Sequence, residues 1–179
     1  MKSHLLSMWN VLDPLYFRFT RLQYVMDQNK KKTLFRVRLT RYKGKPVILQ
    51  DGTEINKNDV LLKIHLHNVK MLHELKQVNG DIKRGVYVYH MIKRSLPILD
   101  SYVRLHWKAN EIKGIIGITT LYRGAERLGF EIFPISNPYY MLYKKWTFVP
   151  INFLANAVCH HNPVYLFMSK DKLSHLNDQ

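Results

Sequence analysis

Strong positive charge and a large apolar content occur together in this chain, and the combination limits what the chain can fold into. Lys and Arg number 28 against 13 Asp and Glu, which gives a net charge of +15, yet 46% of the residues are hydrophobic. A disordered basic tail lacks that apolar content, whereas a compact domain with that charge repels itself. We therefore expect residues 1–179 to form one folded domain that has an anionic partner.

Length, cysteine content and the N-terminal pattern exclude several classes of protein. A chain of 179 residues can bury a core without cross-links. Its one cysteine, Cys159, excludes an intrachain disulfide framework and a cysteine-based zinc site. Because Asp13, Pro14 and Arg18 interrupt the N-terminal apolar run, we expect no signal peptide, and no stretch reaches the ~20 apolar residues of a membrane span. The expected location is the cytoplasm, with peripheral attachment to the membrane as an alternative.

The first half of the chain combines one helix with a small β meander. Apolar residues at spacings of three and four predict a helix over residues 4–25, with a kink at Pro14. Alternating apolar residues predict a strand over 33–42, and turns separate it from further strands at 47–49 and 60–66.

The second half mixes helices and strands. One helix is expected to follow Asn68, which can cap it, and to end at Asn79-Gly80. A second is expected over 84–108, with a break at Pro97. The remaining expected elements are strands at 113–119, 130–135 and 164–168, helices at 121–128 and 138–158, and a terminal helix that starts at Ser169. The short crossover within 113–135 favours parallel pairing of its two strands. The expected fold class is α+β, a single domain with a mixed sheet, an N-terminal helix and a strand–helix–strand unit at 113–135.

A basic run provides the strongest local signal. No acidic residue occurs between Asp27 and Asp51. On a strand Arg36 and Arg38 share one face about 7 Å apart, a spacing that suits a nucleic-acid strand, a polyphosphate, a teichoic-type polymer or anionic lipid. The alternative is a solvated, solubilising face. Phe35 and Tyr42 within the run either stack on a ligand or pack in the core. The candidate anion-binding residues of this run are Arg36, Arg38, Arg41, Lys43 and Lys45.

Two histidines and an asparagine form a second candidate site. Alternation places His65 and His67 on one strand face with Lys63 beside them. Two histidines at this spacing can bind a metal, but the third ligand is missing locally and Lys63 would repel a cation, so no metal is expected. The alternatives are a polar site that faces a ligand and a structural strand end with Asn68 as a helix cap.

A pair of arginines forms the third candidate. Arg123 and Arg127 follow a predicted strand and lie four residues apart, so on a helix they would share a face and could hold a phosphate together. The segment lacks the pattern of a P-loop, and the alternative is an exposed helix face. Farther along, residues 138–148 are aromatic-rich, and solvent exposure of Tyr139, Tyr143 and Trp146 would favour binding of a wall polymer.

Four stretches together are similar to a known family. They are residues 9–16 (WNVLDPLY), 59–68 (DVLLKIHLHN), 117–130 (GITTLYRGAERLGF) and 165–173 (YLFMSKDKL). The chain resembles the YkoP-like family of bacilli and relatives, a domain that occurs alone or appended to polysaccharide deacetylases. The resemblance implies a bacterial cell-envelope or carbohydrate context rather than an activity. The metal-binding Asp and His motifs of the deacetylase domain have no counterpart here.

These observations favour a non-catalytic module that binds an anionic polymer or surface: a wall polymer, its phosphorylated precursor or lipid. No cofactor is expected and no catalytic residue is assigned. Nucleic-acid binding is the first alternative. The second is an enzyme that acts on a phosphorylated or nucleotide-linked sugar, with His65 as general base in a pocket shared with Arg123.

Overall fold

A six-stranded mixed sheet forms the centre of the molecule in the computed structural model, which describes residues 21–75, 77–120, 122–154 and 162–176. Neighbouring strands are antiparallel except β5 and β6, which are parallel. The order across the sheet is β1 (Gln23–Met26), β2 (Lys32–Arg41), β5 (Val60–Leu66), β6 (Ile112–Thr119), β8 (Val164–Ser169) and β7 (Glu131–Pro134). The α+β class with a mixed sheet is confirmed.

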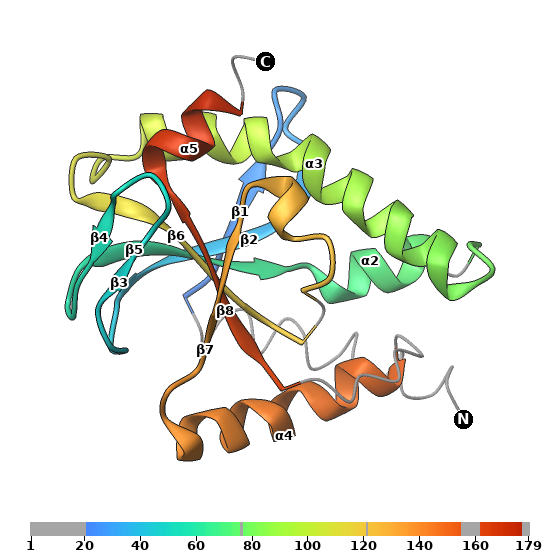
Figure 1. Ribbon diagram of the computed structural model, residues 1–179. Helices are drawn as coiled ribbons and strands as arrows, with labels where there is room; N and C mark the ends of the chain where they lie inside the picture. The colour runs from blue at the N-terminus through green and yellow to red at the C-terminus, as the bar shows by residue number, and fades with distance from the viewer. Residues whose placement is uncertain (1–20, 76, 121, 155–161, 177–179) are drawn as a thin grey trace.

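Helices lie on both sides of this sheet (Figure 1). One side carries α3 (Asp81–Leu105) and α5 (Lys170–His175), and α2 (Asn68–Leu75) packs against α3. The opposite side carries α4 (Pro138–Leu154). A separate two-stranded hairpin is made by β3 (Val47–Ile48) and β4 (Glu54–Ile55).

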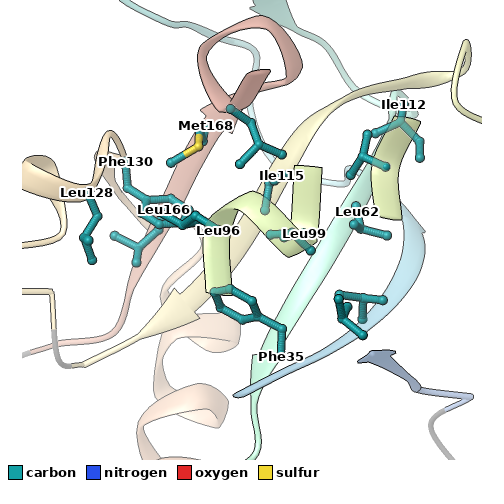
Figure 2. Packing of buried hydrophobic residues seen from close by; sticks show 14 of the residues in the cluster. Phe35, Leu62, Leu96, Leu99, Ile112, Ile115, Leu128, Phe130, Leu166 and Met168 are labelled. Atoms are coloured by element: carbon teal, nitrogen blue, oxygen red, sulfur yellow. The ribbon is translucent and has the colours of Figure 1, made fainter. Parts of the chain in front are cut away.

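The main core lies between the sheet and α3. Phe35 and Val37 on β2 are fully buried against Leu99 of α3, as the alternation of the sequence predicts. Figure 2 shows how this cluster continues across the sheet to Phe130 and Met168. Phe35 is therefore a core residue, and its predicted alternative role in stacking on a ligand is wrong.

A smaller core lies on the opposite side of the sheet, beneath the β3–β4 hairpin. Tyr42 is buried there and packs edge-on against Phe167, with 5.4 Å between ring centroids. Its hydroxyl donates to the Lys45 carbonyl over 2.9 Å, so Tyr42 is not available for stacking either. The backbone N–H of Gln50 donates to the buried Glu131 carboxylate, which ties the hairpin to β7.

Two sequence predictions about helices are corrected by the structure. Residues 23–26 form an edge strand instead of the end of a helix over 4–25, and residues 4–20 of that predicted helix lie outside the described residues. The α3 helix continues through Pro97 without a break. Proline has no backbone N–H, so α3 lacks one helical hydrogen bond at this position. The burial of Leu96 and Leu99 in the main core compensates for that loss.

The strand–helix–strand prediction over 113–135 is correct in its strands but wrong in their pairing. Both β6 and β7 form, but β8 lies between them and is antiparallel to each. The connection contains only a short 3-10 helix, η1 (Glu126–Leu128), in place of the predicted helix over 121–128. The terminal helix is confirmed, because the Ser169 hydroxyl accepts from the Lys172 N–H and caps α5.

Candidate anion-binding site

Four basic side chains meet across the β2–β5 ladder. Arg36 lies directly opposite His65, and Arg38 directly opposite Lys63. Opposite residues of an antiparallel pair point to the same side of the sheet. Because Phe35 and Val37, which alternate with the two arginines, pack toward α3, all four basic residues lie on the other side, where Figure 1 shows α4. From α4, Lys144 acts electrostatically on His65 and Lys63. We call these five residues, Arg36, Arg38, Lys63, His65 and Lys144, the cationic face.

Burial distinguishes this cluster from an ordinary solvated basic patch. Arg36 is 2% exposed and Lys63 is 8% exposed. The Arg36 guanidinium donates from Nη2 to the Tyr24 hydroxyl over 2.7 Å, and its Cζ lies 4.9 Å from the centroid of that ring. The Lys32 ammonium lies 4.3 Å from the same centroid. The predicted solvated-face alternative for Arg36 is therefore wrong.

The two lysines of the cationic face carry the clearest electrostatic signature. Burial lowers the pKa of Lys63 to about 8, with further lowering from Lys144 and Arg38. Burial and Arg38 also lower the pKa of Lys144. Among the described residues, neither lysine forms an ion pair. Because cross-strand like charges destabilise a sheet, this array favours a negatively charged occupant.

His65 has a different protonation state from its neighbours. Burial and the charges of Lys63, Arg38, Lys144 and Arg36 lower its pKa to about 3. His65 is thus neutral near pH 7, and its buried Nε2 atom has no hydrogen-bond partner among the described residues. A group with this pKa is a weak proton acceptor at neutral pH, which argues against the predicted role of general base.

Tyr140 lies near the basic groups, and Tyr165 lies near Tyr140. Burial raises the pKa of Tyr140 on α4, with a further contribution from Tyr143, while Arg38 opposes this shift. Burial also raises the pKa of Tyr165 on β8 to about 12. Both phenols therefore keep their protons at neutral pH, when each can donate a hydrogen bond to an anion.

The structure divides the predicted basic run into two groups. Arg41, Lys43 and Lys45 are exposed at the end of β2 and in the turn that follows it. The Arg41 guanidinium donates to the Asn58 carbonyl over 3.2 Å, and the Lys43 ammonium donates to the Asn58 side chain over 2.7 Å. This turn carries charge at the surface, whereas the buried Arg36 and the half-buried Arg38 contribute to the cationic face.

Arg123 and Arg127 do not join the cationic face. Both are exposed, and their neighbours Ala125 and Leu128 pack into the main core on the α3 side of the sheet. Because η1 begins at Glu126, the two arginines do not share one helix, and the predicted helical clamp is wrong. His65 belongs to the α4 side, whereas the described segment that carries Arg123 packs into the core on the α3 side, which argues against the predicted pocket between the two residues.

The end of β5 leads directly into α2. The His67 ring packs edge-on against Tyr24, with 5.4 Å between centroids, and the His67 carbonyl accepts from the Met71 N–H over 3.0 Å. His67 thus precedes the first turn, and Asn68 is the first helical residue rather than its predicted cap. Within the described ranges, His, Cys, Asp and Glu form no group of three that could hold a metal.

Two cavities lie between β1 and the C-terminal end of α3. The smaller has a volume of about 290 Å³ and is lined in part by Arg38 and Trp107. The larger has a volume of about 820 Å³ and shares Tyr102 and Trp107 with it. Arg38, which belongs to the cationic face, therefore also lines the smaller cavity at the edge of the sheet.

Sequence reasoning missed Lys144 and Tyr24 as parts of the site. Both lie far in sequence from residues 36–65, and only the packing of α4 and the pairing of β1 with β2 bring them to the cationic face. A local pattern carries no signal for such contacts. The described helices also include none with the length and hydropathy needed to cross a bilayer.

Comparison with known proteins agrees with the resemblance of the four sequence stretches. The sequence model of the YkoP domain matches residues 2–177. A protein of Bacillus subtilis (strain 168) named "Uncharacterized protein YkoP" is 48% identical over 177 residues, which cover 97% of this chain and 96% of that protein. No solved structure matches the chain.

Proposed function

The chain belongs to the YkoP domain family, and from its cationic face we propose that it binds an anionic polymer or surface without catalysing a reaction. The observation that carries this proposal is the cross-strand pairing of Arg38 with the buried Lys63, beside Arg36 and Lys144. Burial of several cations beside one another lowers the stability of the folded protein. An anion that binds among them offsets this repulsion, so its binding is strongly favoured.

Phosphate is the ligand group that fits this array best. Arginine forks bind phosphate oxygens through paired hydrogen bonds, and a lysine adds a compact charge. The neutral Tyr140 phenol adds a donor that remains protonated at neutral pH. A wall polymer, its phosphorylated precursor and a lipid headgroup all present this group, which agrees with the envelope context of the resemblance.

Equilibrium binding to phosphate-rich polymers tests this function. The wild-type protein and Lys63→Met are titrated with polyphosphate and with a teichoic-type polymer at low and moderate salt. We expect Lys63→Met to weaken binding by about tenfold or more at moderate salt, since a buried charge contact is lost. Lys83→Met removes the same charge from an exposed position on α3 and should change affinity by less than about twofold.

The outcomes of this titration separate the candidate functions. Equal effects of the Lys63 and Lys83 substitutions would show that attraction is generic and would overturn the proposal. Single- and double-stranded DNA and RNA form a further arm of the panel. A nucleic acid that stays bound at moderate salt while the other polymers dissociate would identify nucleic-acid binding instead.

A further inference from the structure

The outward surface of α4 carries a stripe of large side chains. Tyr139, Leu142, Tyr143 and Trp146 follow the spacing of one helical face, and we call them the α4 stripe. Tyr139 is 84% exposed, Tyr143 is 59% exposed and Trp146 is 69% exposed. Side chains of this size at helical spacing usually face a core, so their exposure marks a surface for interaction. Exposure of these three aromatic residues is what the sequence predicts for binding of a wall polymer, and the positive charge beside them extends the choice to an anionic bilayer.

Positive charge lies beside the α4 stripe. The Lys144 ammonium lies 5.3 Å from the Tyr143 ring centroid and 5.4 Å from that of Tyr140, and Lys145 is exposed next to Trp146. Tyrosine and tryptophan have an apolar body and a polar end, and lysine can extend its charge past an apolar stem. This combination is typical of helices that lie flat in the interface of a bilayer.

We propose that the α4 stripe docks the protein on an anionic lipid bilayer, with α4 parallel to the membrane plane. This inference rests on the proposed function, because it takes the anionic surface of that proposal to be a lipid bilayer. The net charge of +15 complements an anionic leaflet and opposes a second copy of this chain as occupant. Tyr139, Tyr143 and Trp146 then enter the interface while Lys145 meets the headgroups.

Cosedimentation with vesicles tests the docking. Wild-type protein should bind vesicles that contain phosphatidylglycerol and should not bind vesicles of phosphatidylcholine alone. Trp146→Ser should weaken this binding by about tenfold, because the partition of one tryptophan is lost. The matched control is Trp107→Ser at the end of α3, where Trp107 is 83% exposed and lies outside the α4 stripe. This control should change binding by less than about twofold.

Fluorescence reports the insertion of Trp146 directly. A variant with Trp9→Phe and Trp107→Phe keeps only Trp146 of the three tryptophans. Its emission should shift to shorter wavelength and be quenched by brominated lipid in the anionic vesicles. Unchanged emission in bound protein would overturn the assignment of the α4 stripe. Tyr143→Ser provides a second variant if Trp146→Ser alters the far-UV circular dichroism.

A parallel titration with soluble polyphosphate separates this inference from the proposed function. Binding of polyphosphate without binding of anionic vesicles would overturn the membrane inference and leave the proposed function in place. Loss of both would overturn both. Vesicle binding that is equal for wild type and Trp146→Ser would show that the charge alone is responsible and would overturn docking through the α4 stripe.

Discussion

At the scale of single residues, Lys63 combines burial with surrounding positive charge. The difference between its usual pKa of 10.5 and a value of about 8 corresponds to roughly 3 kcal/mol of destabilisation when the lysine is charged. Arg38, which lies directly opposite, contributes part of this cost. A residue that weakens the free protein in this way is typical of a binding site, where a ligand of opposite charge offsets the cost.

Replacement of this lysine should therefore stabilise the protein in the absence of a ligand. We expect Lys63→Met to raise the free energy of unfolding at pH 7 by about 1–3 kcal/mol, because an apolar side chain of similar length replaces a buried charge. Urea denaturation in a buffer without phosphate measures this difference. Lys83→Met, which is exposed, should stay within about 0.5 kcal/mol of wild type.

The pH dependence of stability provides a second test of the cost of burying Lys63. Because the folded pKa of Lys63 is depressed, the unfolded chain binds the proton more tightly between pH 8 and 10.5. The wild type should gain stability across this window as pH rises, and its gap to Lys63→Met should close. A gap that widens instead would mean that the charged lysine stabilises the fold.

The residue scale also shows what the sequence could reveal about the site. Alternation correctly placed Arg36 with Arg38, and Lys63 with His65, on common strand faces. Alternation could not show that these two pairs lie on the same side of the sheet, because that depends on the register between β2 and β5. Burial of Arg36 likewise depends on contacts with Tyr24 from another strand.

At the scale of elements, one serine joins three parts of the fold. The Ser169 hydroxyl accepts from the Lys172 N–H over 3.0 Å and donates to the Asp51 carboxylate in the loop between β3 and β4. Burial alone would raise the pKa of Asp51, but hydrogen bonds from Ser169 and Thr53 outweigh it and lower that pKa. The end of β8, the start of α5 and the hairpin are thus linked.

Removal of this hydroxyl should loosen all three parts together. Ser169→Ala should lower the free energy of unfolding by about 1–2 kcal/mol, since it loses a helix cap and leaves a carboxylate with one fewer donor. Thermal denaturation measures the loss, and hydrogen exchange should show faster opening of α5. Ser136→Ala at an exposed position is the control. Equal stability of the two variants would contradict the structural role of Ser169.

Elements with a strong local pattern were predictable, and their pairing was not. The ten residues of β2 alternate clearly, and β5, β6 and β8 were found at nearly their observed bounds. The four residues of β1 are too few for a period, and they follow a segment with helical spacing. The insertion of β8 between β6 and β7 pairs residues that are 30 or more positions apart in the sequence, so no local pattern indicates it.

At the scale of the whole molecule, the net charge of +15 acts on both stability and binding. Positive groups repel one another in the compact state, and salt screens this repulsion over roughly 8–10 Å at physiological strength. Screening should therefore raise the stability of the free protein while it weakens the attraction to a polyanion. Added salt should thus change the stability of the free protein and its affinity for a polyanion in opposite directions.

Phosphate and chloride should separate screening from binding at the cationic face. At equal ionic strength both salts screen the +15 charge, but only phosphate matches the arginine and lysine array. We expect phosphate to raise the midpoint of thermal unfolding of the wild type more than chloride does, because a ligand that binds only the folded state stabilises it. The general stabilising effect of phosphate on burial is the same in Lys63→Met, which serves as the reference. If the excess over chloride is as large in Lys63→Met as in the wild type, phosphate does not bind through Lys63, and its general effect on burial accounts for the excess.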